Sequence, residues 1–279
     1  MDTTPTPPTG TSTTAIEQQL ADYVAEHRQH LPQLSAAKPS FSALVGKLDA
    51  ALAESPEARQ QREAKEAQRA LTRQRGERQG LLTKLIQAAG NRYATCTLDS
   101  YRVTNQRQQE AVRAVAEYAD MLRDAWESSG LVLYGPIGTG KDHLAFAVAS
   151  LAITELGKRV EWVNGQAWFG QLRDNMDKDI PEAAAIGTLA RPDLLVLSDP
   201  LPPAMQRGDE LTAYQATMLY RLVDARYSRG VPTIVTLNVV DDSEAYRRIG
   251  APTWDRLCHD AWKIACNWPS YRKPKRIVP

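Results

Sequence analysis

The chain has 279 residues, 43% of them hydrophobic, which is enough for one full α/β core and a smaller appendage. Its formal net charge is +1, but the charge is unevenly spread along the chain, so this balance by itself identifies no class of partner. No window approaches the roughly 18 apolar residues of a membrane span and the N-terminus lacks a signal-peptide pattern, so we expect a cytoplasmic protein with no membrane partner.

The first part of the chain is predicted to be a helical region that precedes the main domain. Residues 1–14 are rich in Thr and Pro and are expected to be a disordered tail. Helical patterns follow over 15–31, 41–52 and 57–87, with prolines between them. We predict a charged, partner-binding helical region over 15–89.

The third of these helical patterns is strongly basic. Residues 59–78 hold seven Arg or Lys against three Glu, with charged residues and Gln in alternation. This composition is typical of a solvated helix or a short coiled coil. Such a helix could also contact a nucleic-acid backbone, although solvated charge is the default interpretation. Gly90 is expected to close the region.

From Tyr93 onward the composition is that of a globular α/β domain, which we expect over 90–279. A helical pattern covers 105–126, with Ala111, Val115 and Leu122 on a common face. β-like runs then alternate with helical segments, at 131–134, 159–163, 194–198 and 232–237. This alternation predicts a parallel sheet with helices on both faces.

The cysteines give little functional information. There are three of them, Cys96, Cys258 and Cys266, with no C-x-x-C spacing. An odd number without such spacing predicts reduced thiols and gives no indication of zinc.

A short apolar run leads into a phosphate-binding loop. Residues 131–141 read Leu-Val-Leu-Tyr-Gly-Pro-Ile-Gly-Thr-Gly-Lys, and a helical pattern follows. The glycines let backbone N–H groups curl around phosphate oxygens, and Lys141 reaches the β- and γ-phosphates. We therefore expect a bound nucleoside triphosphate. Its expected contacts are Gly135, Pro136, Ile137, Gly138, Thr139, Gly140, Lys141, Asp142 and His143.

Asp142 stands where this motif has Ser or Thr. A second motif over 191–199 ends in Ser198 and Asp199, where P-loop ATPases present a metal-holding acid and often a second acid. The carboxylate and the hydroxyl have thus exchanged places between loop and strand, which still offers Mg²⁺ a hard anionic ligand. We predict Asp142, Ser198 and Asp199 as metal ligands. The alternative is a degenerate site that binds nucleotide weakly and does not hydrolyse it.

Two further residues are candidates for hydrolysis. Asn238 ends the β-like run over 232–237 and could orient a water between the strand acid and the γ-phosphate. Arg256 follows in a helical segment and could act in trans on the γ-phosphate of a neighbouring subunit. A surface salt bridge to Asp255 or Asp260 is the alternative for this arginine.

These motifs together resemble the DnaC/IstB-type AAA+ ATPases. The resemblance covers about residues 90–275, and the combination is specific although each piece is short. It rests on Gly-Pro-x-Gly-Thr-Gly-Lys-x-His-Leu-Ala, on Asp-Leu-Leu-Val-Leu before the strand acid, on Arg226-Tyr227 before Pro232-Thr-Ile-Val-Thr-x-Asn, on Ser270-Tyr271-Arg272, and on the leading segment 96–105.

The resemblance implies a P-loop AAA+ core with a parallel sheet flanked by helices and no separate lid domain. It implies ATP as the nucleotide, Asp199 as catalytic acid, Asn238 as first sensor and Arg256 as arginine finger. Arg272 is the candidate second phosphate sensor. The family further implies ATP-dependent assembly on single-stranded DNA, with a replicative helicase or a transposase as protein partner.

Three functions therefore stay open at this point. The chain is expected to load a replicative helicase onto single-stranded DNA, to help transposition by recruiting a transposase, or to sense nucleotide without turnover. Candidate DNA contacts are Arg173 and the basic tail 271–276. Trp168, Phe169 and Leu172, on the same helical segment as Arg173, have spacing that favours the core.

Overall fold

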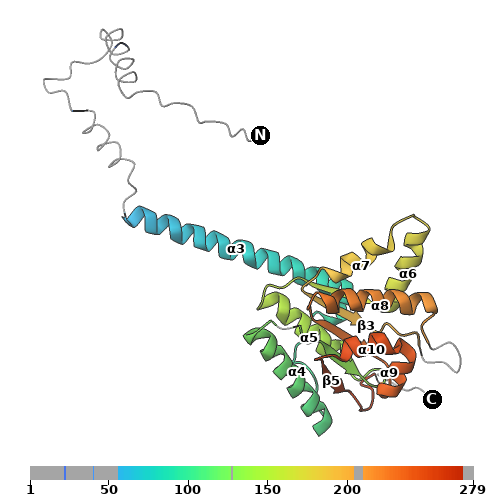
Figure 1. The fold of residues 1–279 in the computed structure, drawn as a ribbon. Coiled ribbons are helices and arrows are strands. Elements are labelled where there is room, and N and C mark those ends of the chain that lie inside the picture. Colours follow the sequence, from blue (N-terminus) through green and yellow to red (C-terminus); the bar gives the residue numbers. More distant parts are fainter. Residues whose placement is uncertain (1–21, 23–39, 41–55, 127, 204–209, 273–279) are drawn as a thin grey trace, which may run out of the picture. The chain divides into compact units, whose positions relative to one another are not determined.

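The computed structural model describes residues 22, 40, 56–126, 128–203 and 210–272 (Figure 1). The expected tail, the expected first two helices apart from Asp22, and the tail beyond residue 272 lie outside these ranges. By compactness the chain divides into two units, Met1–Lys65 and Glu66–Pro279. Each is described by itself.

The described part of the first unit consists mainly of the start of α3 (Pro56–Ala89), so the helix predicted over 57–87 is confirmed. Residues 57–65 are exposed, and Arg59 Nε donates to Glu63 Oε1 over 3.0 Å along the helix. Such exposed pairs one turn apart contribute only a few tenths of a kcal/mol. This segment is therefore a solvated helix.

The second unit begins within α3, because the last turns of this helix pack into the core. Leu85 is 2% exposed, and it lies in the same apolar cluster as the helices that follow. Leu81, Leu82, Ile86 and Ala89 pack partly buried against that cluster. The compact unit thus starts at Glu66, upstream of the boundary expected at residue 90.

The second unit contains a parallel sheet of five strands in the order β2-β3-β4-β1-β5. The strands are β1 (Leu131–Tyr134), β2 (Val160–Asn164), β3 (Leu194–Ser198), β4 (Thr233–Leu237) and β5 (Trp262–Ala265). The first four match the predicted runs. β5 was not predicted, because it is a short edge strand with Lys263 in its middle and only one buried residue, Ile264.

Helices cover both faces of the sheet, as predicted (Figure 1). Side chains alternate between the faces along each strand, so Leu131 and Leu133 join one apolar cluster while Val132 joins the other. One face carries the end of α3, α4 (Gln106–Asp124) and α5 (Lys141–Thr154). The other carries α6 (Gly165–Met176), α7 (Glu182–Ala190), α8 (Ala213–Ser228), α9 (Asp242–Ile249) and α10 (Ala251–Cys258).

The described residues that follow β4 return to the sheet. After β4, helices α9 and α10 lead into β5, which pairs in parallel with β1. Among the described residues, everything after β4 therefore belongs to the sheet-containing unit. The P-loop α/β fold is thus present as expected, and the described residues after β4 form no separate lid. No helix among the described residues is long and apolar enough to cross a membrane.

Helix α6 contributes to the core. Trp168, Phe169 and Leu172 are 3%, 2% and 1% exposed and pack in the second apolar cluster. The core interpretation of these side chains is therefore confirmed, and they have no free ring face on which a DNA base could stack. Arg173 on the same helix is exposed.

Candidate nucleotide site

A cavity of about 820 Å³ lies where β1, β3 and β4 end. The carboxyl ends of parallel strands meet at this edge, which is the usual place for ligands in such sheets. The cavity is lined mainly by the loop before α5 and by the ends of β3 and β4. Two flanking segments, around residues 92–102 and 271–272, complete the lining. Most of the residues that the sequence analysis predicts as nucleotide contacts line this cavity.

The phosphate-binding loop is held from outside by donors that bind its carbonyl groups. Thr139 O accepts from Tyr101 Oη over 2.7 Å and from Trp268 Nε1 over 2.9 Å. Gly138 O accepts from the backbone N–H of Tyr271 over 2.9 Å. With its carbonyls bound in this way, the loop can present its N–H groups to an anion.

Two loop glycines are required by close approach as well as by backbone angle. Gly135 has φ 140°, and a Cβ there would lie 2.6 Å from the carbonyl oxygen of Cys266. Gly138 has φ 80°, and a Cβ there would lie 2.0 Å from Ser270 Oγ. No larger residue fits either position unless the chain after β5 moves.

Lys141 is folded against its own loop. Its Nζ donates to Gly135 O over 2.8 Å and to Pro136 O over 2.7 Å, and the residue is 6% exposed. An ammonium has three N–H donors, so one is left for a phosphate oxygen. Burial lowers the pKa of Lys141, although the nearby carboxylates of Asp142 and Asp199 act in the opposite direction.

Asp142 is the centre of a network of hydroxyl groups. Its Oδ1 accepts from Thr236 Oγ1 over 2.7 Å and from Ser198 Oγ over 3.1 Å. Its Oδ2 accepts from Tyr93 Oη over 3.2 Å. The structure therefore brings together the two residues of the expected exchange, Asp142 and Ser198. It adds Thr236 and Tyr93, which the sequence analysis missed.

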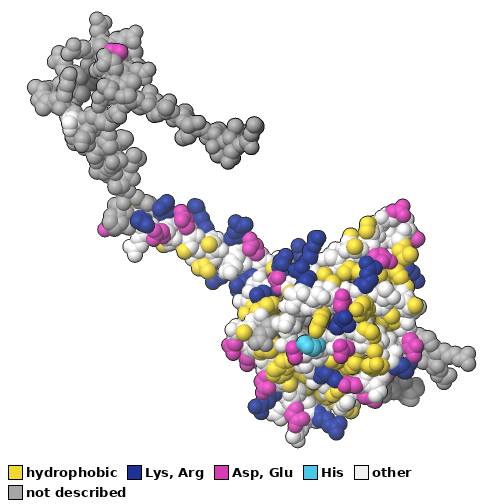
Figure 2. All heavy atoms as spheres, viewed as in Figure 1, with side chains coloured by type: hydrophobic (Ala, Val, Ile, Leu, Met, Phe, Trp, Pro, Cys, Tyr) yellow, Lys and Arg dark blue, Asp and Glu magenta, His cyan; other side chains and the backbone are white. Residues whose placement is uncertain are grey.

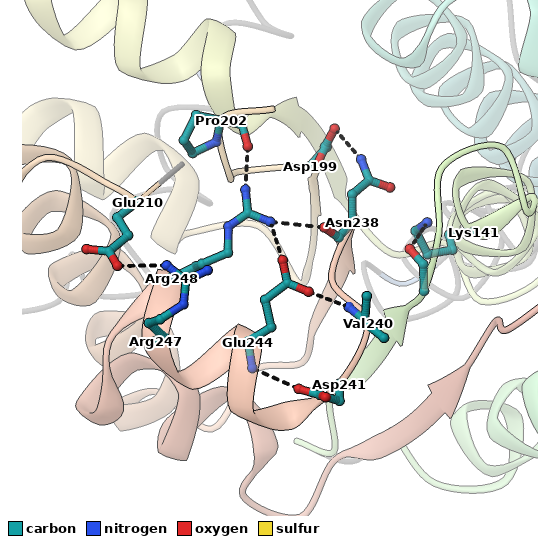
Figure 3. A network of polar contacts seen from close by, with 11 residues as sticks. Lys141, Asp199, Pro202, Glu210, Asn238, Val240, Asp241, Glu244, Arg247 and Arg248 are labelled. Carbon is teal, nitrogen blue, oxygen red and sulfur yellow. Dashed lines mark hydrogen bonds and ion pairs between the residues drawn. The ribbon is translucent and has the colours of Figure 1, made fainter. Parts of the chain in front are cut away.

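Asp199 and Asn238 face each other at the ends of β3 and β4 (Figure 3). Asn238 Nδ2 donates to Asp199 Oδ2 over 2.7 Å. Asp199 has φ 45°, and its N–H donates to the carbonyl and the hydroxyl of Thr236, over 3.0 and 3.2 Å. Burial raises the pKa of Asp199, and the charge of Asp142 raises it further.

A buried arginine supports the strand end that carries Asn238 (Figure 3). Arg248 of α9 is 2% exposed and donates to Asn238 O over 3.1 Å and to Pro202 O over 2.5 Å. It also pairs with Glu244 over 3.1 Å, and Glu244 accepts from the N–H of Val240 over 2.7 Å. The ends of β3 and β4 are thereby tied to one helix.

His143 and Arg272, two of the predicted nucleotide contacts, have different surroundings. His143 Nε2 lies 2.8 Å from Thr97 O and 3.2 Å from Ser100 Oγ, so the imidazole fastens the leading segment to α5. Arg272 is exposed and lines the cavity, and its charge helps to lower the pKa of Lys141. The role of Arg272 as a second phosphate sensor stays a prediction.

Arg256 is outside the set of described residues that line the cavity. Its Nε donates to Asp224 of α8 over 2.7 Å, and its guanidinium lies over the rings of Tyr220 and Tyr227, 4.9 and 5.8 Å from their centroids. The ion-pair partner is therefore Asp224, where the sequence analysis had named Asp255 or Asp260. The role of Arg256 in trans stays a prediction.

The oxygen atoms around Asp142 are suitable ligands for a magnesium ion. They are carboxylate and hydroxyl oxygens, from Asp142, Asp199, Ser198 and Thr236, and Mg²⁺ prefers such hard ligands. Among the described residues, no group of three or more His, Cys, Asp or Glu side chains could hold a metal alone. A magnesium ion here would therefore share its coordination with nucleotide phosphates and water.

Part of what was missed carried a readable signal. Thr236 lies near the end of β4, two residues before Asn238, and a hydroxyl at the carboxyl end of a central strand is suited to reach the site. Glu244 and Arg248 are four residues apart on one helix, which is the spacing of an ion pair. Tyr93 gave no such signal, because its partner lies 49 residues away.

Known structures with a similar fold include the DnaC helicase loader and DnaI. The DnaC helicase loader matches with a TM-score of 0.54 and 22% identity, over 63% of this chain and 99% of its own. DnaI matches with a TM-score of 0.51 and 16% identity, over 66% of this chain and 94% of its own. At these identities the likeness shows the fold alone.

The family is shown by sequence. No protein of curated function matches the chain. The sequence model of the IstB-like ATP binding protein family, however, matches residues 50–278, which is well over half of the chain and includes the whole cavity. Because this match covers most of the chain, the chain belongs to the IstB-like ATP-binding protein family.

Proposed function

We propose that this chain is an AAA+ ATPase that assists DNA replication by loading a replicative helicase onto single-stranded DNA. The observation that carries the proposal is the contact between Asp199 and Asn238, in the same cavity as the buried Lys141. An acid held by an amide at the strand ends is the arrangement that polarises and orients a water beside a γ-phosphate. The fold likeness to the DnaC helicase loader favours this function.

Each residue has a definite task in the proposed reaction. The loop N–H groups and Lys141 bind the β- and γ-phosphates and stabilise the charge that develops there. Asp199 accepts a hydrogen bond from the attacking water and aligns it. Asn238 keeps the Asp199 carboxylate in place, and Arg248 fixes the backbone of Asn238 from behind.

Asp142, Ser198 and Asp199 would hold Mg²⁺ together with the phosphates. The ion would supply neutralisation of phosphate charge when bound. Asp142 is suited to this because it places a negative charge where the general P-loop motif has a neutral hydroxyl. Ser198 and Thr236 hold that carboxylate in one orientation, since both donate to the same oxygen, Oδ1.

Arg256 would act on the nucleotide of a second copy of the chain. The side chain of Arg256 is 27% exposed, and its guanidinium is bound by Asp224. Assembly would therefore have to exchange the Asp224 carboxylate for a γ-phosphate. Asp224→Asn, which removes the competing charge, should favour self-association in the presence of ATP.

Residues 15–89 would bind the protein partner, and Arg173 is the candidate DNA contact. On the face in view in Figure 2, Lys and Arg side chains alternate with Asp and Glu over the sheet-containing unit. DNA binding would then depend on a few placed cations in an assembled ring of subunits, because a mixed surface gives little steering. Deletion of residues 1–65 leaves the compact unit intact and should abolish partner binding.

A transposition helper that recruits a transposase is the second candidate, and membership of the IstB-like family favours it. A nucleotide sensor without turnover is the third, favoured by the carboxylate at position 142 and the hydroxyl at position 198. The three differ in what they do with ATP and in what they bind.

The decisive experiment is an ATP turnover assay on the full chain, with and without single-stranded DNA, beside a measurement of ATP affinity. We expect turnover that single-stranded DNA stimulates and that Asp199→Asn abolishes while ATP affinity changes little. Binding without turnover would favour the sensor. Pull-down against a replicative helicase and a transposase in parallel then separates the first two candidates.

A further inference from the structure

The carboxylate of Asp142 creates an electrostatic problem that the rest of the site has to solve. The general P-loop motif has a neutral hydroxyl at this position, so this chain adds a negative charge beside the expected place of the phosphates. The charge of Asp142 lies near enough to Asp199 to add to the burial that raises the pKa of Asp199. Lys141 is thus a single ammonium between two carboxylates and a triphosphate.

A second cation reaches Asp142 through a tyrosine. Arg92 Nη2 donates to Tyr93 Oη over 2.6 Å, and Tyr93 Oη in turn donates to Asp142 Oδ2 over 3.2 Å. The guanidinium carbon of Arg92 lies 4.7 Å from the centroid of the Tyr93 ring. Both residues belong to η1 (Asn91–Tyr93), and both line the nucleotide cavity.

The tyrosine is fixed from behind, so the bridge has a defined geometry. Tyr93 is 9% exposed, and its ring lies 6.0 Å from the rings of Phe146 in α5 and Trp162 in β2. The hydroxyl is therefore held between Arg92 and Asp142, while Arg92 itself is exposed to the cavity. Polarisation along this chain of hydrogen bonds strengthens each bond.

We propose that Arg92, positioned by Tyr93, offsets the charge of Asp142 and so allows this chain to bind a triphosphate beside an extra carboxylate. Arg92 and Tyr93 are positioning residues, which act on the nucleotide through Asp142. This inference rests on the proposed binding of ATP and concerns residues that the P-loop motif does not include.

Two other arginines make the inference specific to Arg92. Arg102 and Arg272 line the same cavity and bring the same charge. Among the described hydrogen bonds, however, neither guanidinium reaches Asp142 directly or through a neighbour, whereas that of Arg92 does so through one hydroxyl. If general positive charge were all that mattered, the three would be equivalent. If Arg92 acts by offsetting the charge of Asp142, only the effect of removing Arg92 should depend on the presence of Asp142.

A double-mutant cycle on the full chain tests this dependence. ATP affinity is measured for the wild type, Arg92→Gln, Asp142→Asn and the double variant, with Mg²⁺ and again in EDTA, because Asp142 is also a candidate metal ligand. Arg92→Gln should weaken ATP binding about tenfold in the presence of Asp142 and less than about twofold in the Asp142→Asn background, in both media. Arg92→Lys should restore part of the loss.

Matched variants exclude a general loss of charge or packing. Arg102→Gln removes an equal charge from the same cavity and should lower ATP affinity by the same factor in both backgrounds. Tyr93→Phe keeps the ring against Phe146 and Trp162 but removes the bridging hydroxyl. It should reproduce much of the Arg92→Gln effect beside Asp142 and show little effect beside Asp142→Asn.

The outcomes separate the inference from the function on which it rests. A wild-type chain that binds no ATP overturns both. An equal loss from Arg92→Gln in both backgrounds overturns the inference and means that Arg92 contacts the phosphates directly. An unchanged affinity of Arg92→Gln in the wild-type background overturns it as well, while ATP binding by the wild type still stands.

Discussion

The two sides of the nucleotide cavity are built in different ways. The loop side is one run of chain, residues 135–143, whose shape depends on glycines and on donors that bind its carbonyls. The strand side is assembled from η1, the ends of β3 and β4, and α9, which are up to about 150 residues apart in the chain. The first has a recognisable motif, whereas the second is recognisable only in part.

The difference teaches how this protein accommodates its departure from the general P-loop motif. The loop keeps every glycine and the lysine, and its one unusual residue, Asp142, points its side chain to the other side. There the network of Thr236, Ser198 and Tyr93 receives that carboxylate. The change in the motif is thus accommodated by residues outside the motif, and four experiments with substituted chains can break or sharpen this comparison.

The largest effect is expected from Lys141→Ala on the loop side. The ammonium is the main point charge that faces the phosphates, so its loss should weaken ATP binding about tenfold or more. Isothermal titration of ATP into both proteins measures it, with the unfolding midpoint as control for folding. Unchanged affinity would remove the P-loop interpretation altogether.

Gly135→Ala should damage the loop through the backbone. The added Cβ would lie 2.6 Å from the carbonyl oxygen of Cys266, and the alanine would have to adopt φ 140°. We therefore expect a loss of about 2 kcal/mol in the free energy of unfolding. Urea denaturation measures the change.

Gly187→Ala is the matched control for that substitution. Gly187 lies within α7 with open space around it, so alanine there should stabilise by about 0.5–1 kcal/mol. Equal effects of the two variants would show that the close approach of Cys266 to the loop is unimportant.

On the strand side, Asp142→Thr and Ser198→Asp test the exchanged pair. Because Ser198 Oγ lies 3.1 Å from Asp142 Oδ1, the double variant restores the usual hydroxyl on the loop and carboxylate on the strand. Each single change should weaken Mg-ATP binding, and the double variant should regain much of it. The interaction between the two changes should exceed about 1 kcal/mol. Additive losses would instead support a degenerate site.

The smallest effect is expected from Thr236→Val, which keeps the shape and removes the hydroxyl. Asp142 then loses its shortest hydrogen bond and the N–H of Asp199 loses one acceptor, so we expect a cost of about 1–2 kcal/mol in unfolding. Thr217→Val in α8 is the control, because that exposed hydroxyl binds a carbonyl of its own helix. Its change should stay within about 0.5 kcal/mol.

Sequence reasoning succeeded where local physics decides. The P-loop follows from glycine and lysine spacing, and the first four strands follow from apolar runs. The order of strand acid and strand amide brought Asp199 and Asn238 to one site, where the structure has them in contact. The loop and the strands can each be read within about ten residues of chain, whereas the contact between Asp199 and Asn238 joins residues 39 apart.

The rest depends on which elements meet. The end of α3 was predicted to be solvated, because charge dominates the helix as a whole, yet Leu85 in its last turns is buried. Tyr93 and Arg248 act on partners that only the folded sheet brings near. Asp224 became the partner of Arg256 because α8 packs beside α10, which no spacing along the sequence reveals.

The left-handed backbone of Asp199 has a consequence for how this lineage can change. At φ 45° most side chains are strained, whereas Asn and Gly are tolerated and Asp itself is accepted. Single-base changes of an aspartate codon lead to Asn and to Gly. The mildest substitutions for the backbone are thus also those that delete the acid. On the proposed role of Asp199, either change would abolish ATP turnover while the fold and nucleotide binding persist, so an intact sheet in a relative would be no proof of a working ATPase.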